Sequence, residues 1–238
     1  MMRAREAPTD ERAGQSDDSS TRRAFGARIP SRSRSPETTA ALAAAAALLG
    51  AFAMLAALVR ADGALAFDRA ILRTLEPHYY DQPAHRLAQL VLAPGGEYFA
   101  PLPALIIAAL VVVLAKRGLP AEALFVLLAA AVPMLLTSIL KPFFPQPGLH
   151  HGADVDSYFP SGHAMGEIAV VAALALLAWP TRWRWWTLVL GVGFIVAYGA
   201  SVVFLREHYP SDVLAGWCLG GAWVALLWVA FARRRIRT

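Results

Sequence analysis

The sequence predicts an all-α, polytopic membrane protein, and three observations support this fold class. Of the 238 residues, 57% are hydrophobic and only 16% are charged. The mean hydropathy is +0.47, which is more apolar than an ordinary soluble domain. Apolar stretches about as long as a membrane-spanning helix alternate with short segments that carry basic residues. We therefore expect a bundle of six transmembrane helices within residues 38–232.

The two ends of the chain differ in composition from this membrane domain. Residues 1–37 are rich in Arg, Ser, Asp, Glu and Pro and nearly free of large apolar residues, which predicts a disordered cytoplasmic tail. Residues 233–238 form a short basic tail that we also place in the cytoplasm. The formal net charge of +5 is concentrated in the tails and short loops. We interpret it as a topology signal and expect no nucleic-acid partner.

Each expected span follows from an apolar run with polar residues at its ends. After the first run, residues 60–98 mix acidic and basic side chains, and their apolar residues recur at roughly helical spacing. This pattern predicts an extracytoplasmic amphipathic helix and loop rather than a further span. The six expected spans cover approximately residues 39–59, 98–115, 121–140, 161–179, 185–205 and 211–231.

Basic residues predict the orientation in the membrane. With a cytoplasmic N-terminal tail, six spans place Lys116, Arg117, Arg182, Arg184 and the C-terminal arginines on the cytoplasmic side. We therefore expect a multi-pass protein of the plasma (inner) membrane with both termini in the cytoplasm. The same topology brings five polar residues from separate segments to the extracytoplasmic face: Lys141, His163, Arg206, His208 and Asp212.

The segment Pro160-Ser161-Gly162-His163 runs directly into the fourth apolar stretch. The first N–H groups of a helix have no intrahelical partners, and together with the helix dipole they favour a bound anion. His163 lies at the edge of this site and can move a proton near neutral pH. The segment therefore predicts a phosphate-binding site at the end of a helix.

A second histidine and a carboxylate precede the sixth span. His208 can attack phosphorus and form a phosphoenzyme intermediate, while Asp212, four residues later, can orient its imidazole ring. We expect His163 to act as the general acid for the leaving group. Charge for the phosphoryl oxygens would come from protein groups, so no metal and no cofactor are implied. The expected phosphate-binding residues are Lys141, Ser161, Gly162 and, as argued below, Arg206.

These residues resemble the type 2 phosphatidic acid phosphatase (PAP2) family, which shares its helical core with vanadium haloperoxidases. The family pattern has three parts: Lys, six residues, Arg-Pro; then Pro-Ser-Gly-His; then Ser-Arg, five residues, His, three residues, Asp. The second part is complete at residues 160–163, and the third appears as Ser201, His208 and Asp212. The resemblance implies a membrane lipid phosphatase and covers residues 141–221 most clearly.

The chain departs from the family pattern at both arginines. Gly148-Leu149 stands where Arg-Pro is expected, and Val202 stands where the second Arg is expected. Arg206 lies four residues after Val202, so it would share a helical face with Val202 if the fifth helix continued that far. His150 or His151 is a weaker candidate to replace the other missing arginine in binding phosphate.

Several polar residues also have ordinary structural explanations. Lys141 alone is typical of a lysine at a membrane boundary, and Arg206 with Glu207 is equally well explained as an interfacial charge pair. Glu167 lies one turn after His163 inside a span, where it either changes the charge of the site or makes a structural hydrogen bond. A metal loop at His150, His151, Asp154 and Asp156 is less favoured than a solvated loop.

The sequence therefore predicts a metal-independent phosphatase that hydrolyses a lipid phosphate or pyrophosphate, such as a polyprenyl pyrophosphate or a phosphatidate. Its expected partners are this substrate and the membrane lipids, and no oligomeric state is predicted. The missing arginines keep a second hypothesis open, in which a catalytically impaired relative binds phosphorylated lipid or has a non-enzymatic membrane role. A transporter has less support, because the ionisable residues lie mostly at one face.

Overall fold

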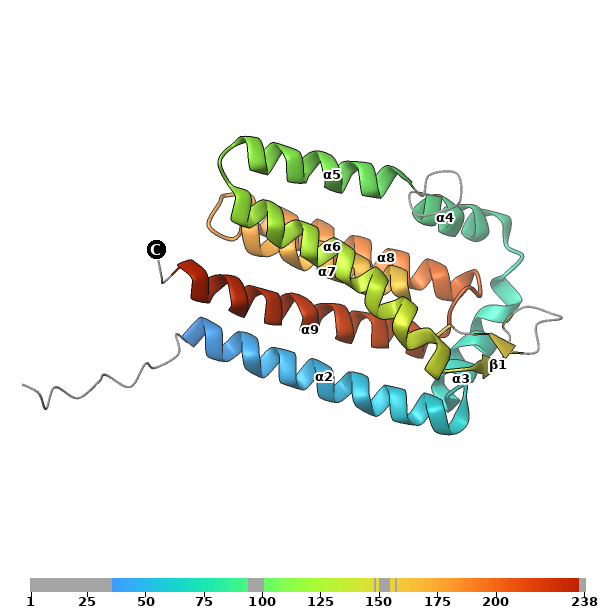
Figure 1. The fold of residues 1–238 in the computed structure, drawn as a ribbon. Coiled ribbons are helices and arrows are strands. Elements are labelled where there is room, and N and C mark those ends of the chain that lie inside the picture. Colours follow the sequence, from blue (N-terminus) through green and yellow to red (C-terminus); the bar gives the residue numbers. More distant parts are fainter. Residues whose placement is uncertain (1–35, 94–100, 148, 150–154, 157, 236–238) are drawn as a thin grey trace, which may run out of the picture. The chain divides into compact units, whose positions relative to one another are not determined.

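The computed structural model describes residues 36–93, 101–147, 149, 155–156 and 158–235, and within them it shows a bundle of α-helices (Figure 1). The long apolar helices fall on the stretches that the sequence predicts. Their bounds are Pro36–Asp62 (α2), Pro101–Lys116 (α5), Pro120–Leu140 (α6), Gly162–Ala178 (α7), Arg184–Phe204 (α8) and Pro210–Arg235 (α9).

Four of these helices are long and apolar enough to cross a membrane within the part of the chain that is described. They are α2, α6 with the turn that follows it, α8 and α9. Helices α5 and α7 are also apolar but shorter, with 16 and 17 residues. The chain therefore contains several apolar helices of the kind found in multi-pass membrane proteins.

Local signals explain where the helices start. Pro120 and Pro210 are the first residues of α6 and α9, a position at which proline costs no backbone hydrogen bond. Ser161 is the N-cap of α7, and its hydroxyl oxygen accepts a hydrogen bond from the backbone N–H of Ala164 at 3.4 Å. These signals fix the starts of the two helices that carry the candidate catalytic motifs.

The amphipathic segment between α2 and α5 contains two short helices, α3 (Ala66–Leu75) and α4 (Gln82–Leu92), joined by the 3-10 turn η1 (Glu76–His78). The expected single helix and loop is therefore two helices. Asp68 of α3 is buried, and its Oδ1 and Oδ2 accept hydrogen bonds from the backbone N–H of Ser211 at 2.8 Å and from its hydroxyl at 2.7 Å. Burial raises the pKa of the Asp68 carboxyl. This contact fastens α3 to the start of α9.

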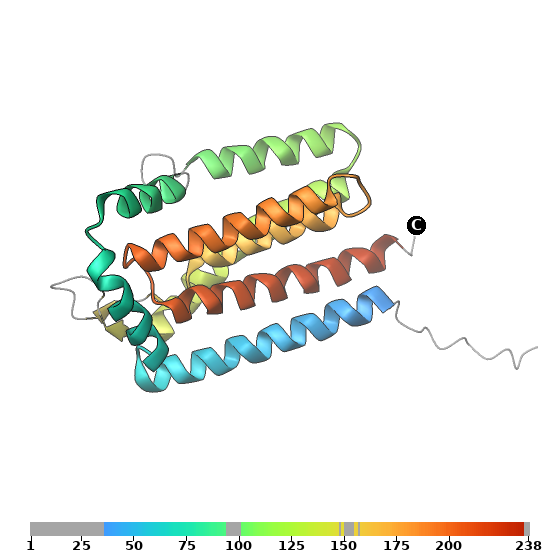
Figure 2. The same ribbon diagram turned by 180° about the vertical axis from the view of Figure 1, so that it is seen from behind.

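Helix α9 lies between α2 and α7 (Figures 1 and 2). The approach of α7 is close: a Cβ added at Gly216 would lie 2.6 Å from the carbonyl oxygen of Ser161, and one at Gly220 would lie 2.3 Å from that of Met165. Small residues allow helix backbones to approach in this way in membrane proteins. A buried apolar cluster then joins α6, α7 and α9: Phe125, Ala129, Ala169, Ala173, Val224 and Leu227.

The connection between α6 and α7 begins with the 3-10 turn η3 (Lys141–Phe143) and contains two short strands, β1 (Gln146–Pro147) and β2 (Val155–Asp156). The strands pair antiparallel, with Gln146 opposite Asp156 and Pro147 opposite Val155. The sequence predicts only a loop here. Strand β1, which carries Gln146, lies at the end of the bundle near α3 (Figure 1).

Candidate functional site

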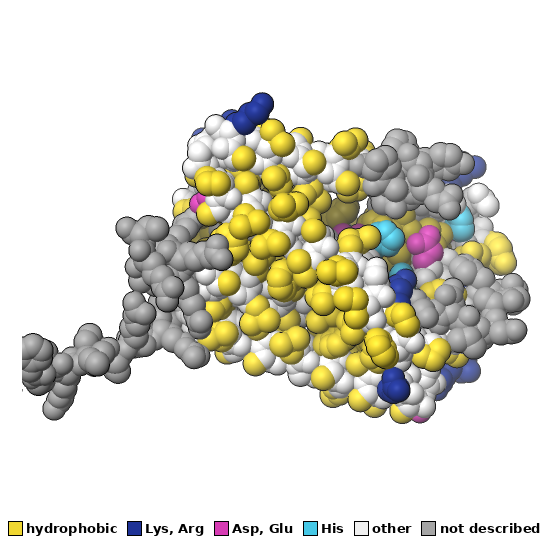
Figure 3. All heavy atoms as spheres, viewed as in Figure 1, with side chains coloured by type: hydrophobic (Ala, Val, Ile, Leu, Met, Phe, Trp, Pro, Cys, Tyr) yellow, Lys and Arg dark blue, Asp and Glu magenta, His cyan; other side chains and the backbone are white. Residues whose placement is uncertain are grey.

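The candidate catalytic residues come from helix ends that meet at one end of the bundle. Helices α6 and α8 finish there, and α7 and α9 begin there, next to α3 and β1 (Figure 1). On the face drawn in Figure 3, hydrophobic side chains cover the sides of the helices, while histidine and acidic side chains gather around a hollow near this end. The polar residues expected to share one face do lie at the same end of the bundle.

His208 and Asp212 form the closest pair of candidate catalytic side chains. The Nδ1 atom of His208 lies 3.4 Å from Oδ2 of Asp212, and both side chains are buried. The same Oδ2 accepts a hydrogen bond from the backbone N–H of Tyr209 at 2.9 Å. A carboxylate beside Nδ1 favours the tautomer that carries its proton there, which leaves the lone pair on Nε2. A free lone pair on Nε2 is what the predicted nucleophilic role of His208 requires.

A backbone hydrogen bond joins the N-terminal end of α7 to the N-terminal end of α9. The backbone N–H of Ser161 donates to the carbonyl oxygen of Asp212 at 3.1 Å, and Ser161 itself is fully buried. Gly216 has no side chain, so the backbone of Ser161 can approach α9 closely. The helix start that we expect to bind an anion is therefore held next to the His208–Asp212 pair. The two sequence motifs are brought together as the sequence predicts.

His163 and Lys141 complete the group. Lys141 follows α6 and begins η3, and the His163 side chain is exposed near the first turn of α7. His208 and Lys141 are the two charged neighbours that interact electrostatically with His163. The Tyr198 ring of α8 lies beside that of His163, with the ring centroids 6.2 Å apart. The residues predicted to act as the general acid and as a phosphate-binding cation therefore both lie near His208.

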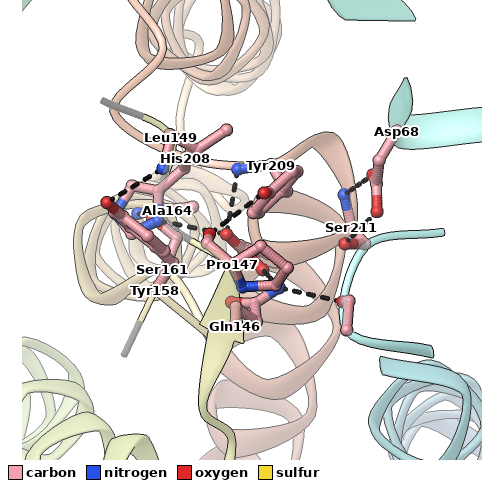
Figure 4. Close-up of polar contacts among 12 residues, drawn as sticks. Asp68, Gln146, Pro147, Leu149, Tyr158, Ser161, Ala164, His208, Tyr209 and Ser211 are labelled. Atoms are coloured by element: carbon pink, nitrogen blue, oxygen red, sulfur yellow. Dashed lines mark hydrogen bonds and ion pairs between the residues drawn. The ribbon is translucent and has the colours of Figure 1, made fainter. Parts of the chain in front are cut away.

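Two tyrosines surround His208. The Tyr158 ring packs edge-on against those of His208 and Tyr209, at 6.1 Å in each case. The Tyr209 hydroxyl donates to the carbonyl oxygen of Pro147 at 3.1 Å (Figure 4). Burial, with the nearby Asp212 carboxylate, raises the pKa of Tyr209 to about 12. Tyr209 is therefore neutral at physiological pH and joins the start of α9 to β1.

Gln146 is the site residue that sequence reasoning missed. It is almost fully buried, and its Nε2 donates to Oδ1 of Asp212 at 3.0 Å and to the carbonyl oxygen of Gly63 at 3.4 Å (Figure 4). Its Oε1 is buried with no hydrogen-bond partner among the described residues. The sequence shows only a glutamine between two prolines, five residues after Lys141, and this resembles an ordinary loop.

Arg206 does not lie where the sequence argument placed it. Helix α8 ends at Phe204, and Arg206 has a positive φ of 61°, so the assumption of a helical face shared with Val202 is wrong. Its guanidinium lies 3.6 Å from the Glu76 carboxylate and 5.3 Å from the centroid of the Tyr79 ring. Arg206 therefore contacts Glu76 of η1 and Tyr79, the C-cap residue of η1, because the backbone turns before it reaches Arg206.

Of the two positions at which a family arginine is replaced, Val202 lies within the described residues and Gly148 does not. Val202 is fully buried and belongs to the apolar core cluster formed by residues of α4, α7, α8 and α9. Gly148, His150, His151 and Asp154 lie outside the described residues, so the hypotheses that involve them stay untested. Glu167 is half-buried in α7, and its Oε2 has no hydrogen-bond partner among the described residues.

Metal ligands were searched over the described residues, and these contain no group of three or more His, Cys, Asp or Glu side chains arranged to hold an ion. The cations of the site in that part of the chain are those of Lys141 and, when protonated, the two histidines. The arrangement can thus bind an anion, attack it with His208 and move a proton with His163.

Comparisons with known proteins find similarity to phosphatases. The model of the PAP2 superfamily matches residues 122–236. Similar curated proteins include an undecaprenyl-diphosphatase from Sulfolobus acidocaldarius, 38% identical over 90 residues that cover 37% of this chain and 41% of that protein. A lipid A 1-phosphatase from Rhizobium etli is 39% identical over 75 residues, covering 32% of this chain and 30% of that protein. The matched regions thus span less than half the length of these relatives.

A solved structure shows the same fold. It is the crystal structure of a transmembrane PAP2-type phosphatidylglycerolphosphate phosphatase from Bacillus subtilis. The TM-score is 0.61 at 21% identity, and the alignment covers 80% of this chain and 96% of that one. The helical arrangement is therefore shared over most of the chain, well beyond the segment of strong sequence similarity.

Proposed function

Residues 122–236 match the model of the PAP2 superfamily, and from this match we propose that the chain belongs to that superfamily and is an integral membrane phosphatase. Its substrate is a lipid phosphate or pyrophosphate, and the reaction passes through a phosphohistidine. The observation that carries the proposal is the buried His208–Asp212 pair, fastened through the backbone of Ser161 to the start of α7. The curated relatives are named as phosphatases of lipid substrates, which supports the same reaction class.

In the first step the substrate phosphate is bound by the Lys141 ammonium, the Ser161 hydroxyl and the backbone N–H of Gly162. Nε2 of His208 attacks phosphorus while the bond from phosphorus to the leaving oxygen breaks. Protonated His163 donates its proton to that oxygen. The imidazole of His208 becomes cationic as the new N–P bond forms, and the neighbouring Asp212 carboxylate stabilises that charge.

In the second step a water molecule replaces the departed group. His163, now neutral, takes a proton from this water as its oxygen attacks phosphorus. The N–P bond breaks, inorganic phosphate leaves, and His208 regains its lone pair. His163 is protonated again, so the cycle returns to its starting state without a metal or a cofactor.

We place the site at the extracytoplasmic end of six spans. At about 1.5 Å per residue, α5 and α7 are close to the lower length limit of a spanning helix. The connections that carry Lys116, Arg117, Arg182 and Arg184 lie at the end of the bundle opposite the site (Figure 1). The positive-inside rule therefore supports cytoplasmic termini in a plasma (inner) membrane.

The second candidate function is that of an impaired relative that binds phosphorylated lipid. The specific observation in its favour is that Val202 is buried in the core and Arg206 pairs with Glu76. An Arg–phosphate contact is worth roughly 1.5–3 kcal/mol. Without such contacts, the groups that we propose could still bind a phosphate while turning it over slowly.

The deciding experiment measures phosphate release by the purified protein in detergent with EDTA present. Polyprenyl pyrophosphate and phosphatidate are the two substrates, and labelled substrate is acid-quenched to detect phosphohistidine. We expect His208→Ala to lower the rate by at least about a thousandfold and to abolish the label on the protein.

The matched control is His78→Ala, because His78 is an exposed histidine outside the site that pairs with Asp81. This variant should keep the wild-type rate. Release that survives in His208→Ala refutes the proposed mechanism. Tight binding of either lipid by a folded protein that releases no phosphate would instead favour the impaired-relative function.

A further inference from the structure

A polar cavity with a volume of about 350 Å³ lies beside the candidate catalytic residues. Its walls come from the end of α2, from α3 and η1, from Pro147 of β1 and nearby Leu149, and from the turn between α8 and α9. Lys141, Ser161, His163 and His208 do not line it. The cavity is therefore separate from the groups that the proposed reaction uses.

Three arginines from two parts of the chain line this cavity. Arg69 and Arg73 are four residues apart on α3 and so share one face of that helix. Arg206 reaches the cavity from the α8–α9 turn, and its positive φ places it there rather than along α8. A positive φ is uncommon for a residue other than glycine. Two separate elements thus bring guanidinium groups to the same cavity.

These guanidiniums are only partly neutralised. Two carboxylates, Asp62 and Glu76, also line the cavity, and Glu76 forms the ion pair with Arg206 at 3.6 Å. Arg69 donates to the carbonyl oxygen of Ala64 and forms no ion pair with a carboxylate of the described residues. For Arg73 the described residues provide no recorded hydrogen bond or ion pair. The cavity therefore has more cationic than anionic groups, and Arg73 is available to a ligand.

The cavity and the nucleophile are linked through two aromatic rings. Tyr209 lines the cavity and directly follows His208 in the chain. The Tyr158 ring lies 6.1 Å from the rings of both residues. A ligand that reaches from one site to the other would pass beside these tyrosines.

We propose that this cavity is a subsite for a second phosphate group, one that is bound but not hydrolysed. Arginine suits this role, because its planar fork matches phosphate oxygens and keeps its charge at all relevant pH values. The inference rests on the proposed phosphatase function and deepens it. The enzyme should therefore prefer lipids in which a spacer separates the reacting phosphate from a second phosphate.

The test compares phosphatidylglycerol phosphate, in which a glycerol separates two phosphates, with phosphatidate of the same acyl chains. Arg73→Gln should raise KM for the two-phosphate lipid by about tenfold, the loss of one charge-assisted contact, and change KM for phosphatidate by less than about twofold. Arg86→Gln is the matched control, since Arg86 is an exposed arginine of α4 that does not line the cavity. It should change neither KM.

Glu76→Gln provides a second variant with the opposite expected sign. It removes the carboxylate that pairs with Arg206, so KM for the two-phosphate lipid should fall while KM for phosphatidate stays unchanged. This variant keeps the inference testable if Arg73→Gln does not fold. Equal changes for the two lipids in both variants, together with no phosphate effect in the assay below, overturn the subsite.

An assay with added inorganic phosphate tests whether the subsite binds free phosphate or the second phosphate group of the lipid substrate. If free phosphate occupies the subsite, added phosphate changes phosphatidate hydrolysis in the wild type and not in Arg73→Gln, while the two lipids are not distinguished. If the substrate occupies it, the lipids are distinguished as described above. Either result supports a phosphate subsite.

Equilibrium binding of both lipids to His208→Ala protein separates failure of the subsite from failure of the proposed function. Without turnover, adding Arg73→Gln should still weaken binding of the two-phosphate lipid selectively. If the wild type hydrolyses neither lipid but this selective loss is found, the function fails and the subsite stands. If hydrolysis depends on His208 and neither this selective loss nor the effect of added phosphate is found, the subsite fails alone.

Discussion

Asp212 is the residue on which most contacts of the site converge. It lies next to Nδ1 of His208, accepts from the backbone of Tyr209 and accepts from Gln146, while its own carbonyl oxygen accepts from Ser161. A buried carboxylate with several donors holds a single orientation. The ring of His208 is therefore oriented by a network rather than by one pair.

We expect Gln146 to affect catalysis through this network, because it donates a hydrogen bond to Asp212. Replacing it by leucine (Gln146→Leu) removes the donor to Oδ1 of Asp212, so the carboxylate loses part of its orientation toward His208. We expect kcat to fall by about 10–100-fold with little change in KM, as is typical when a supporting hydrogen bond is lost. Steady-state kinetics and rapid-quench measurement of phosphohistidine formation check this.

The control for this variant is Gln89→Leu, at an exposed glutamine of α4. It should leave both constants unchanged, and Gln146→Asn should restore part of the rate. An increase in KM alone, with phosphohistidine formed at the wild-type rate, would show that Gln146 does not position the catalytic pair.

At the scale of the elements, the approach of α7 to α9 determines the geometry of the site. Gly216 faces the backbone of Ser161, the N-cap of α7, and Gly220 faces that of Met165 one turn later. The helix start that we expect to bind the phosphate belongs to α7, while Asp212 belongs to α9 and His208 lies in the turn just before it. The distance between the two helices therefore sets the distance between Ser161 and the His208–Asp212 pair.

A methyl group at Gly216 tests this dependence. Because its Cβ would lie 2.6 Å from a backbone oxygen, Gly216→Ala must displace one helix. Such overpacking costs about 1–3 kcal/mol, and a small misplacement of reacting groups can cost about a hundredfold in rate. Thermal unfolding in detergent and phosphate release measure the two effects.

Gly193→Ala is the matched control, since a Cβ added at that position of α8 would meet no atom within 4 Å beyond the adjacent backbone of its own helix. It should leave stability and activity nearly unchanged. Wild-type stability and rate in Gly216→Ala would mean that the two helices can separate without cost to the site.

At the scale of the whole molecule, the polar residues of the site and the arginine-rich cavity lie at one end of an apolar bundle. A lipid whose phosphate lies at the membrane surface can reach such a site while its chains stay in the bilayer. This arrangement requires that α5 and α7, the two shorter apolar helices, both cross the membrane.

Cysteine labelling tests these crossings in a Cys218→Ala background, since Cys218 is the only native cysteine. Tyr80→Cys lies before α5, Arg117→Cys after it, and Thr181→Cys after α7, and all three positions are exposed. An impermeant maleimide added to intact spheroplasts should label only Tyr80→Cys, and permeabilisation should expose the other two. Labelling of Tyr80→Cys and Arg117→Cys from the same side would mean that α5 does not span.

The sequence by itself determined the apolar helices and the residue types of the catalytic motifs. Run length, helix-start signals and the motif at residues 160–163 are local properties, and the structure places α7 and α9 where they predict. The end of α8 was not determined in this way. Nothing in the sequence before Arg206 predicts that the helix stops at Phe204, so the face that Arg206 presents was predicted wrongly.

Only the tertiary structure decided which distant residues support the site. Gln146 meets Asp212 across 66 residues of sequence, and Asp68 meets Ser211 across 143. The arginine-lined cavity likewise joins α3 to the α8–α9 turn. Such contacts depend on how helices pack and where the chain turns between them, and a local sequence pattern carries no information on either. The helices and catalytic residue types were therefore predictable, whereas the contacts that orient and extend the site were not.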